Sequence, residues 1–194
     1  VNKHLLDVLS SYNFCNNDAD SADLFKSYAE ELGGKYLEAY NNTFKYGYYC
    51  FSDDPHSMTT AFQWGFPGSN DSILYFSKNY QNILSVIHEF GHLYSYYASN
   101  GKRSNDAYDL QETYSQADEY LFLNYLLDKK DKDENKATYE YFAYSSFYEN
   151  LGNIINFACI AEIENFAFTQ ENLDLETLRA GAEEIIASYQ GTAS

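Results

Sequence analysis

The chain has 194 residues, of which 45% are hydrophobic and 19% aromatic, a composition too apolar for an intrinsically disordered protein. That length is enough for one domain with a hydrophobic core. The 12 Lys and Arg residues are outnumbered by 29 Asp and Glu residues, which gives a formal net charge of −17. Such a field repels phosphate backbones and anionic membrane surfaces. We therefore expect no nucleic-acid partner and no membrane partner.

The cysteines and the two ends of the chain bear on its compartment. An odd number of widely separated cysteines favours reduced thiols over a disulfide framework, and this predicts a cytoplasmic protein. Residues 1–9 lack the basic and apolar regions of a signal peptide, so we expect none. The missing initiator Met and the polar end at 191–194 predict a processed product or a piece of a longer protein, and a secreted form stays open. The cysteines are Cys15, Cys50 and Cys159.

The first part of the chain predicts a helical lead-in followed by a small sheet. Residues 1–35 have helical apolar spacing, which Gly33 and Gly34 interrupt. Residues 36–77 contain aromatic clusters separated by turn residues such as Pro55 and Pro67, a pattern typical of strands and turns. We expect short strands near 46–52, 59–64 and 73–76.

Helices are predicted for the rest of the chain. Over 78–127 we expect two, the first from Lys78 to Ser99 with Ser77 as its N-cap, and the second beginning near Asn105. C-terminal helices follow over 137–190, and the charged segment between them is a solvated connection. The predicted fold is α+β and mainly helical, with one domain over 1–194. The apolar stripe of the second helix comprises Leu110, Tyr114, Ala117, Leu121 and Tyr125.

One pentapeptide is a candidate metal-binding motif: the sequence from His88 to His92 is His-Glu-Phe-Gly-His. Residues four apart lie on one face of a helix, so both imidazoles can reach one metal ion while Glu89 lies beside it. Neutral imidazoles bind zinc, and a nearby carboxylate can take a proton from a water at the open coordination position. The motif therefore predicts one Zn²⁺ ion and a hydrolytic site.

A catalytic zinc site needs a third protein ligand, and Glu112 on the next predicted helix is the candidate. If the two helices pack antiparallel around Asn100 and Gly101, Glu112 can face both histidines. Glu119 lies seven residues further on the same helical face, where it could accept a hydrogen bond from a ligand histidine. The predicted metal ligands are thus His88, His92 and Glu112.

These two segments resemble the zinc oligopeptidases related to oligoendopeptidase F and thimet oligopeptidase, a gluzincin family. The resemblance rests on Val86 to His92 and on the Glu-x-x-Ser-x-x-x-Glu string from Glu112 to Glu119; it covers most of this chain but only a fraction of a typical member. It implies a zincin-like catalytic core, a peptide substrate cleaved at internal bonds, and Glu89 as general base. The stretch Ala61, Phe62 and Gln63 is similar to the family's substrate-binding strand edge.

Departures from the family leave alternatives open. Many members have a histidine where this chain has Ser95. The spacing from Glu89 to Glu112 is closer to that of thermolysin-like peptidases, which however carry Asp at the position of Gln116. The family's His- and Tyr-rich segment, which donates to the oxyanion, has no counterpart after Gln190. The alternatives are a thermolysin-like peptidase, a zinc-bound peptide-binding domain without turnover, and a helical interaction module with an accidental motif.

Overall fold

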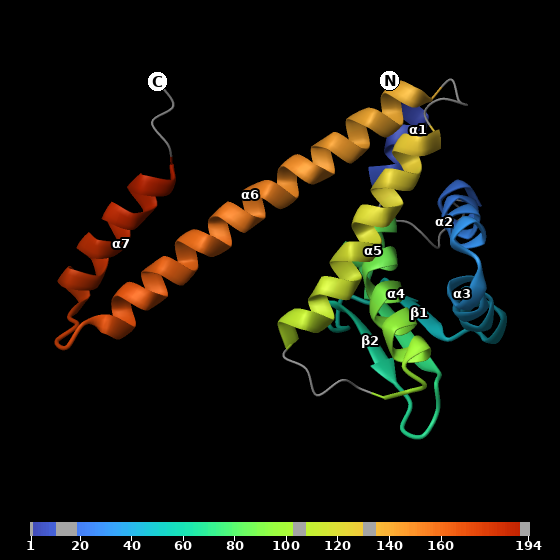
Figure 1. The fold of residues 1–194 in the computed structure, drawn as a ribbon, viewed down its shortest axis with the longest axis horizontal. Helices are drawn as coiled ribbons and strands as arrows, with labels where there is room; N and C mark the ends of the chain where they lie inside the picture. The colour runs from blue at the N-terminus through green and yellow to red at the C-terminus, as the bar shows by residue number, and fades with distance from the viewer. Residues whose placement is uncertain (1, 11–18, 103–107, 130–134, 191–194) are drawn as a thin grey trace. The chain divides into compact units, whose positions relative to one another are not determined.

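The computed structural model describes residues 2–10, 19–102, 108–129 and 135–190. It is mainly helical with a small three-stranded sheet, which confirms the predicted α+β fold class (Figure 1). Two compact units divide the chain, 1–143 and 144–194. The helices are α1 (Lys3–Ser10), α2 (Ala19–Leu32), α3 (Gly34–Tyr46), α4 (Ile83–Ala98), α5 (Tyr108–Lys129), α6 (Lys136–Thr169) and α7 (Leu175–Tyr189), and the strands are β1 (Tyr49–Ser52), β2 (Ala61–Gly65) and β3 (Ser72–Ser77).

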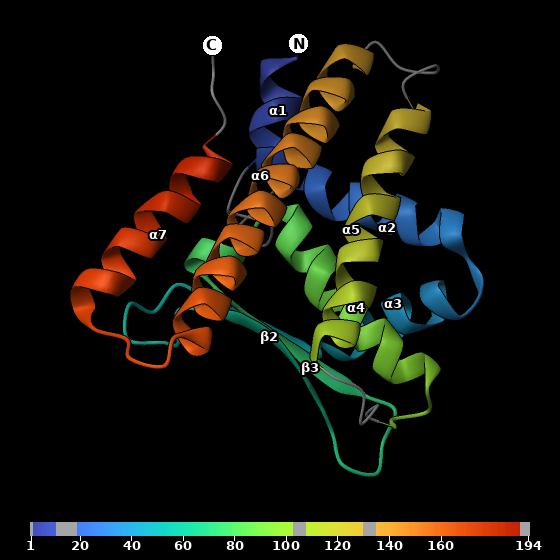
Figure 2. The same cartoon turned by 60° about the vertical axis from the view of Figure 1, so that its left-hand side comes forward.

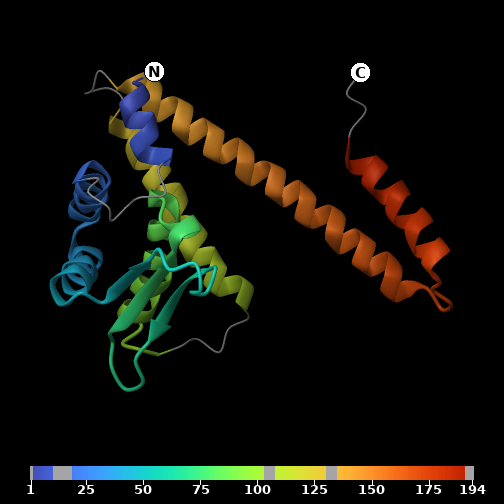
Figure 3. The same cartoon turned by 180° about the vertical axis from the view of Figure 1, so that it is seen from behind.

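The sheet has the order β1-β3-β2, with β1 parallel and β2 antiparallel to the central strand (Figure 3). Alternate residues of β3, such as Leu74 and Phe76, are buried, as expected when one face of a strand meets the core. Helix α4 packs against β2 and β3. At Gly65 a Cβ would lie 2.4 Å from Cζ of Tyr96, so only glycine lets the end of β2 approach α4 this closely.

Aromatic side chains form the centre of the first unit. Phe25 of α2 lies 5.2 Å from Phe90 of α4 between ring centroids, and Tyr36 of α3 lies 5.0 Å from the same ring. These edge-to-face contacts join three helices and favour a single arrangement of the rings. The first turns of α6 also contribute buried side chains to the first unit, Phe142 and Ala143. Helix α4, which carries the pentapeptide, is therefore anchored in this aromatic core.

Two element boundaries differ from the prediction. The stretch Gly34–Tyr46, expected in the sheet region, is a helix, because the positive φ angles of Gly33 and Gly34 redirect the chain into a second helix. Helix α4 begins at Ile83, and its N-cap is Asn82, whose side chain accepts a hydrogen bond from the Ser85 amide at 2.9 Å. The predicted cap, Ser77, instead precedes a short 3₁₀ turn. The strands lie within three residues of their predicted bounds.

The buried face of α5 also differs from the predicted apolar stripe. Tyr114 and Leu121 of that stripe are 56% and 52% exposed, whereas Ser115 and Asp118 are buried. Polar residues can occupy a buried face when hydrogen bonds satisfy them, and Asp118 accepts bonds from two tyrosines. Tyr125 of the same stripe is buried, so hydrophobicity predicted one end of the buried face and missed its polar part at Ser115 and Asp118. Residues 103–107, which include its predicted start, lie outside the described residues.

The second unit contains the later part of α6 and the whole of α7. The side chain of Asp174 caps α7 by accepting a hydrogen bond from the Thr177 amide at 2.7 Å. A Cβ at Gly181 would lie 2.3 Å from the Phe166 ring, so a glycine is needed where the two helices meet. Among the described residues, none of the helices is both apolar enough and long enough to cross a bilayer.

Candidate metal centre

Helix α4 presents the two histidines of the pentapeptide on one side. The His88 and His92 rings lie 5.0 Å apart between centroids, as one turn of helix dictates. The side chains of His88 and His92 are 23% and 18% exposed. Both imidazoles are therefore held by the helix while remaining accessible to an ion from solvent.

Helix α5 brings Glu112 to the same place. It lies antiparallel to α4 (Figure 2), and the carboxylate oxygens of Glu112 lie 3.2 Å from Nε2 of His88 and 3.7 Å from Nε2 of His92. Two ligands of a tetrahedral zinc ion with bonds of 2.0–2.1 Å stand about 3.3 Å apart. One ligand atom from each residue can be chosen so that all three lie within 4.8 Å of one another. This group has the composition and spacing to hold a metal ion such as zinc.

Glu119 contacts Nδ1 of His88, the ring nitrogen that does not face Glu112. Its Oε1 lies 2.6 Å from Nδ1 of His88, so a protonated Nδ1 donates a hydrogen bond to this carboxylate. That tautomer leaves the lone pair of Nε2 on the side of Glu112, where a metal ligand requires it. Carboxylates that orient ligand histidines in this way are common around metal ions.

The electrostatics of the two histidines differ. Burial lowers the pKa of His88, but the hydrogen bond and charge of Glu119, with Glu89 and Glu112 nearby, outweigh that effect and raise it overall. Burial and the charge of His88 lower the pKa of His92. Without a metal, carboxylates therefore favour protonation of His88, whereas burial and the charge of His88 disfavour protonation of His92. The same negative field also favours a bound cation.

Glu89 lies beside the histidines and is 9% exposed. Burial, with a contribution from the charge of Glu112, raises the pKa of Glu89 to about 7, although the charge of His88 and a hydrogen bond from the Gln63 backbone oppose the rise. A carboxyl group with a pKa near neutrality can both take and release a proton. The backbone hydrogen bond also ties this carboxylate to strand β2.

Among the described strands, β2 forms one edge of the sheet, and this edge lies next to Glu89. Backbone bonds from Ser77 to Thr60 and from Phe66 to Asp71 set the ladder with β3, so the backbone groups of Ala61 and Gln63 face away from β3. The Phe62 side chain lies on the opposite face of the sheet from the Gln63 side chain, where its ring stacks 5.0 Å from that of Tyr75. Within the stretch 61–63, the backbone N–H and C=O groups of Ala61 and Gln63 thus point to the outer edge of the sheet. Those of Phe62 point toward β3.

A cleft of about 250 Å³ opens beside His88. Predicted site residues line part of it, and the rest of its wall comes from residues that the sequence did not single out. Tyr80 and Leu84 supply apolar surface at the start of α4. They flank the N-cap Asn82, and nothing in the sequence distinguishes them from residues at the start of any other helix. The lining comprises Ala61, Tyr80, Leu84, Ser85, His88, Glu89 and Glu119.

Comparisons with known proteins give a similarity at the level of fold. No protein-family model matches the chain, and no curated protein matches its sequence. Among solved structures, it is similar to the crystal structure of a provisionally assigned oligoendopeptidase F from Bacillus anthracis str. Ames, with a TM-score of 0.69 and 16% sequence identity. The match covers 90% of this chain and 32% of that protein. The chain therefore has the fold of about a third of an oligoendopeptidase F-like protein.

Proposed function

We propose that the chain carries the catalytic site of a zinc-dependent endopeptidase of the oligoendopeptidase type. The convergence of His88, His92 and Glu112 from two helices, with Glu89 beside them, is the observation that carries this proposal. The similarity in fold to an oligoendopeptidase F-like protein supports the same class of reaction. The proposed ligands are the two imidazoles and the Glu112 carboxylate.

The donor set fits zinc. Two imidazoles and one carboxylate are a known catalytic set, which leaves one coordination position open. When bound, zinc would supply a Lewis acid that polarises the peptide carbonyl and makes water a stronger acid. Glu119 would hold His88 in the tautomer that directs Nε2 toward Glu112.

Glu89 is the proposed general base. Its carboxylate takes a proton from the attacking water and then delivers that proton to the amine that leaves. The hydrogen bond from the Gln63 backbone turns the carboxylate toward the edge of β2. A proton acceptor at this edge lies beside any peptide that pairs with the strand.

The proposed substrate is an extended peptide added as a strand to the edge of β2. Main-chain hydrogen bonds to the Ala61 amide and the Gln63 carbonyl would hold it, as in other cases of strand addition, while the Gln63 amide donates to Glu89. The cleft beside His88 would accept one side chain next to the bond that is cleaved. The net charge of −17 favours neutral or cationic peptides at low ionic strength.

The test compares Glu89→Gln with the parent after both have been loaded with zinc. We expect peptide hydrolysis to fall by about 10²–10⁴-fold, because the base is lost while the ligands remain. Glu38→Gln, the same change at an exposed position on α3, is the control and leaves the rate unchanged. Equal rates for zinc-loaded Glu89→Gln and the parent would contradict the proposal. Peptide binding without any turnover by the parent would favour a non-catalytic peptide-binding domain.

A further inference from the structure

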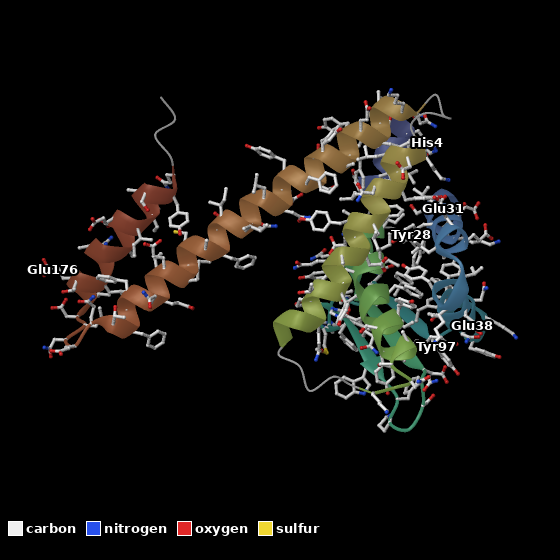
Figure 4. All side chains as sticks on the ribbon, viewed as in Figure 1. His4, Tyr28, Glu31, Glu38, Tyr97 and Glu176 are labelled. Atoms are coloured by element: carbon white, nitrogen blue, oxygen red, sulfur yellow. The ribbon has the colours of Figure 1, made fainter. Side chains whose placement is uncertain are left out.

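A buried carboxylate behind the metal ligands joins three helices. Asp118 of α5 is 5% exposed, and each of its carboxylate oxygens accepts a hydrogen bond from a different tyrosine. Tyr28 of α2 donates to Oδ1 at 2.6 Å, and Tyr36 of α3 donates to Oδ2 at 2.7 Å. Figure 4 labels Tyr28, which lies between α2 and α5. Burial and the charge of Asp118 raise the pKa of both tyrosine hydroxyls, so both remain donors.

Asp118 and the two glutamates of the candidate metal centre point in different directions around the axis of α5. At 100° per residue, Asp118 lies about 100° from Glu119 and about 120° from Glu112. Ser115 lies between the two directions and faces Gly91 of α4, where a Cβ would come within 2.8 Å of Cα of Ser115. The helix is thus pressed against α4 at Ser115, held by tyrosines on one side, and presents its two glutamates on the other.

Such an arrangement fixes the rotation of α5. A carboxylate about 6 Å from the helix axis moves by about 1 Å when the helix rotates by about 10°. Metal–ligand distances tolerate only about 0.2 Å. A small rotation would therefore move Glu112 away from His88 and His92.

We propose that Asp118, held by Tyr28 and Tyr36, is a positioning residue that sets the rotation of α5 and thereby places Glu112 and Glu119 against the two histidines. This inference rests on the proposed function, because the rotation matters only if the glutamates serve a metal site. An apolar side chain at 118 would fill the same space without fixing a direction. Two hydrogen bonds from separate helices fix it, because each carboxylate oxygen must face its own donor.

The experiment removes both hydroxyls in the Tyr28→Phe/Tyr36→Phe variant. Zn²⁺ affinity is measured by competition with a chromophoric chelator, and the Co²⁺-loaded proteins are compared by their visible absorption, at a temperature where the metal-free proteins are folded by circular dichroism. The control is Tyr125→Phe on α5, the helix that carries Asp118. The buried hydroxyl of Tyr125 has no hydrogen-bond partner among the described residues. We expect about a tenfold or larger loss of affinity and an altered Co²⁺ spectrum in the double variant. The control stays within about twofold of the parent.

Substitutions at 118 give a second measurement that does not depend on the double variant folding. Asp118→Asn keeps one oxygen that can accept a tyrosine hydrogen bond, so it should lose less Zn²⁺ affinity than Asp118→Leu, which keeps none. Parent-like affinity and Co²⁺ spectra in every variant, with only thermal stability reduced, would overturn the positioning role alone. A parent that binds neither Zn²⁺ nor Co²⁺ would overturn the proposed function and this inference together.

Discussion

Gly91 of α4 lies closer to Ser115 of α5 than any other residue at position 91 would allow. A Cβ at Gly91 would lie 2.8 Å from Cα of Ser115 and 3.3 Å from Cβ of Asp118. Real side-chain and backbone atoms do not pack at the shorter distance, so the two helices can approach only through glycine. This contact occurs between the histidines of one helix and the glutamates of the other. The spacing of the candidate metal centre thus depends on the absence of a side chain at 91.

Gly91→Ala should therefore push α4 and α5 apart. We expect the free energy of unfolding to fall by about 1–3 kcal/mol and Zn²⁺ affinity to fall with it, measured by thermal denaturation and by chelator competition. Gly152→Ala in α6 is the matched control, because a Cβ there meets nothing within 4 Å. That change should leave Zn²⁺ affinity unaltered and raise helix stability slightly. Unchanged affinity in Gly91→Ala would show that the close approach does not set the site.

Glu119→Gln should weaken metal binding without removing a ligand. The carboxylate contacts Nδ1 of His88 at 2.6 Å, and a neutral amide accepts the same hydrogen bond less strongly. We expect Zn²⁺ affinity to fall by about tenfold, because partners of ligand histidines tune their orientation and basicity. Glu149→Gln, at an exposed position on α6, should leave the affinity as it is. Equal losses in the two variants would point to net charge as the cause instead.

Asp118→Asn should change how the stability of the metal-free protein depends on pH. Burial and the charge of Glu119 raise the pKa of Asp118 from 3.8 to about 6, although both tyrosine hydrogen bonds oppose the rise. The folded parent therefore binds more protons than the unfolded chain between these values, so its stability falls as pH rises from about 4 to about 6. As pH rises across that window, the free energy of unfolding of Asp118→Asn should increase by about 3 kcal/mol relative to that of the parent.

Denaturant unfolding at several pH values checks this difference. The other titrating groups are common to both proteins, so their contributions largely cancel when one curve is subtracted from the other. A difference that stays constant from pH 4 to pH 7 would show that Asp118 titrates at the same pH in the folded and unfolded states.

Tyr80→Ala should slow the hydrolysis of peptides with a large apolar residue next to the cleaved bond more than that of peptides with a small one. Its ring lines the cleft with Leu84, and lost apolar contact with one substrate side chain costs about 1–3 kcal/mol. We expect kcat/KM to fall about tenfold or more for peptides with a large apolar residue next to the cleaved bond, and much less for those with alanine there. Tyr46→Ala, another exposed tyrosine, should affect both peptides equally little. An equal loss for both peptides in Tyr80→Ala would contradict a specificity role for the cleft.

Periodicity and short motifs predicted much of this architecture. The spacing of His88 and His92 requires only local helix geometry, so one segment of sequence suffices to place both rings on one face. The convergence of Glu112 depended on an antiparallel pair of helices, which the turn at Asn100 and Gly101 indicated. The structure shows positive φ angles at both turn residues and brings the three side chains together.

The parts that escaped prediction depend on contacts distant in sequence. The sequence gives no signal that Asp118 is buried, because the tyrosines that hold it come from α2 and α3, more than 80 residues earlier. The cleft residue Tyr80 likewise becomes part of the site only when the start of α4 meets Ala61 of β2. Helix α3 was missed because paired glycines usually end a helix, and here they separate two.

The zinc content of the purified chain after dialysis tests the central claim most directly. His92→Ala and Glu112→Ala remove proposed ligands, and His56→Ala removes a histidine from an exposed loop as the control. The proposal predicts about one tightly held ion in the parent and in His56→Ala, and weakened binding in both ligand variants. No zinc in the parent after reconstitution at neutral pH, or equal retention by all four proteins, would contradict it.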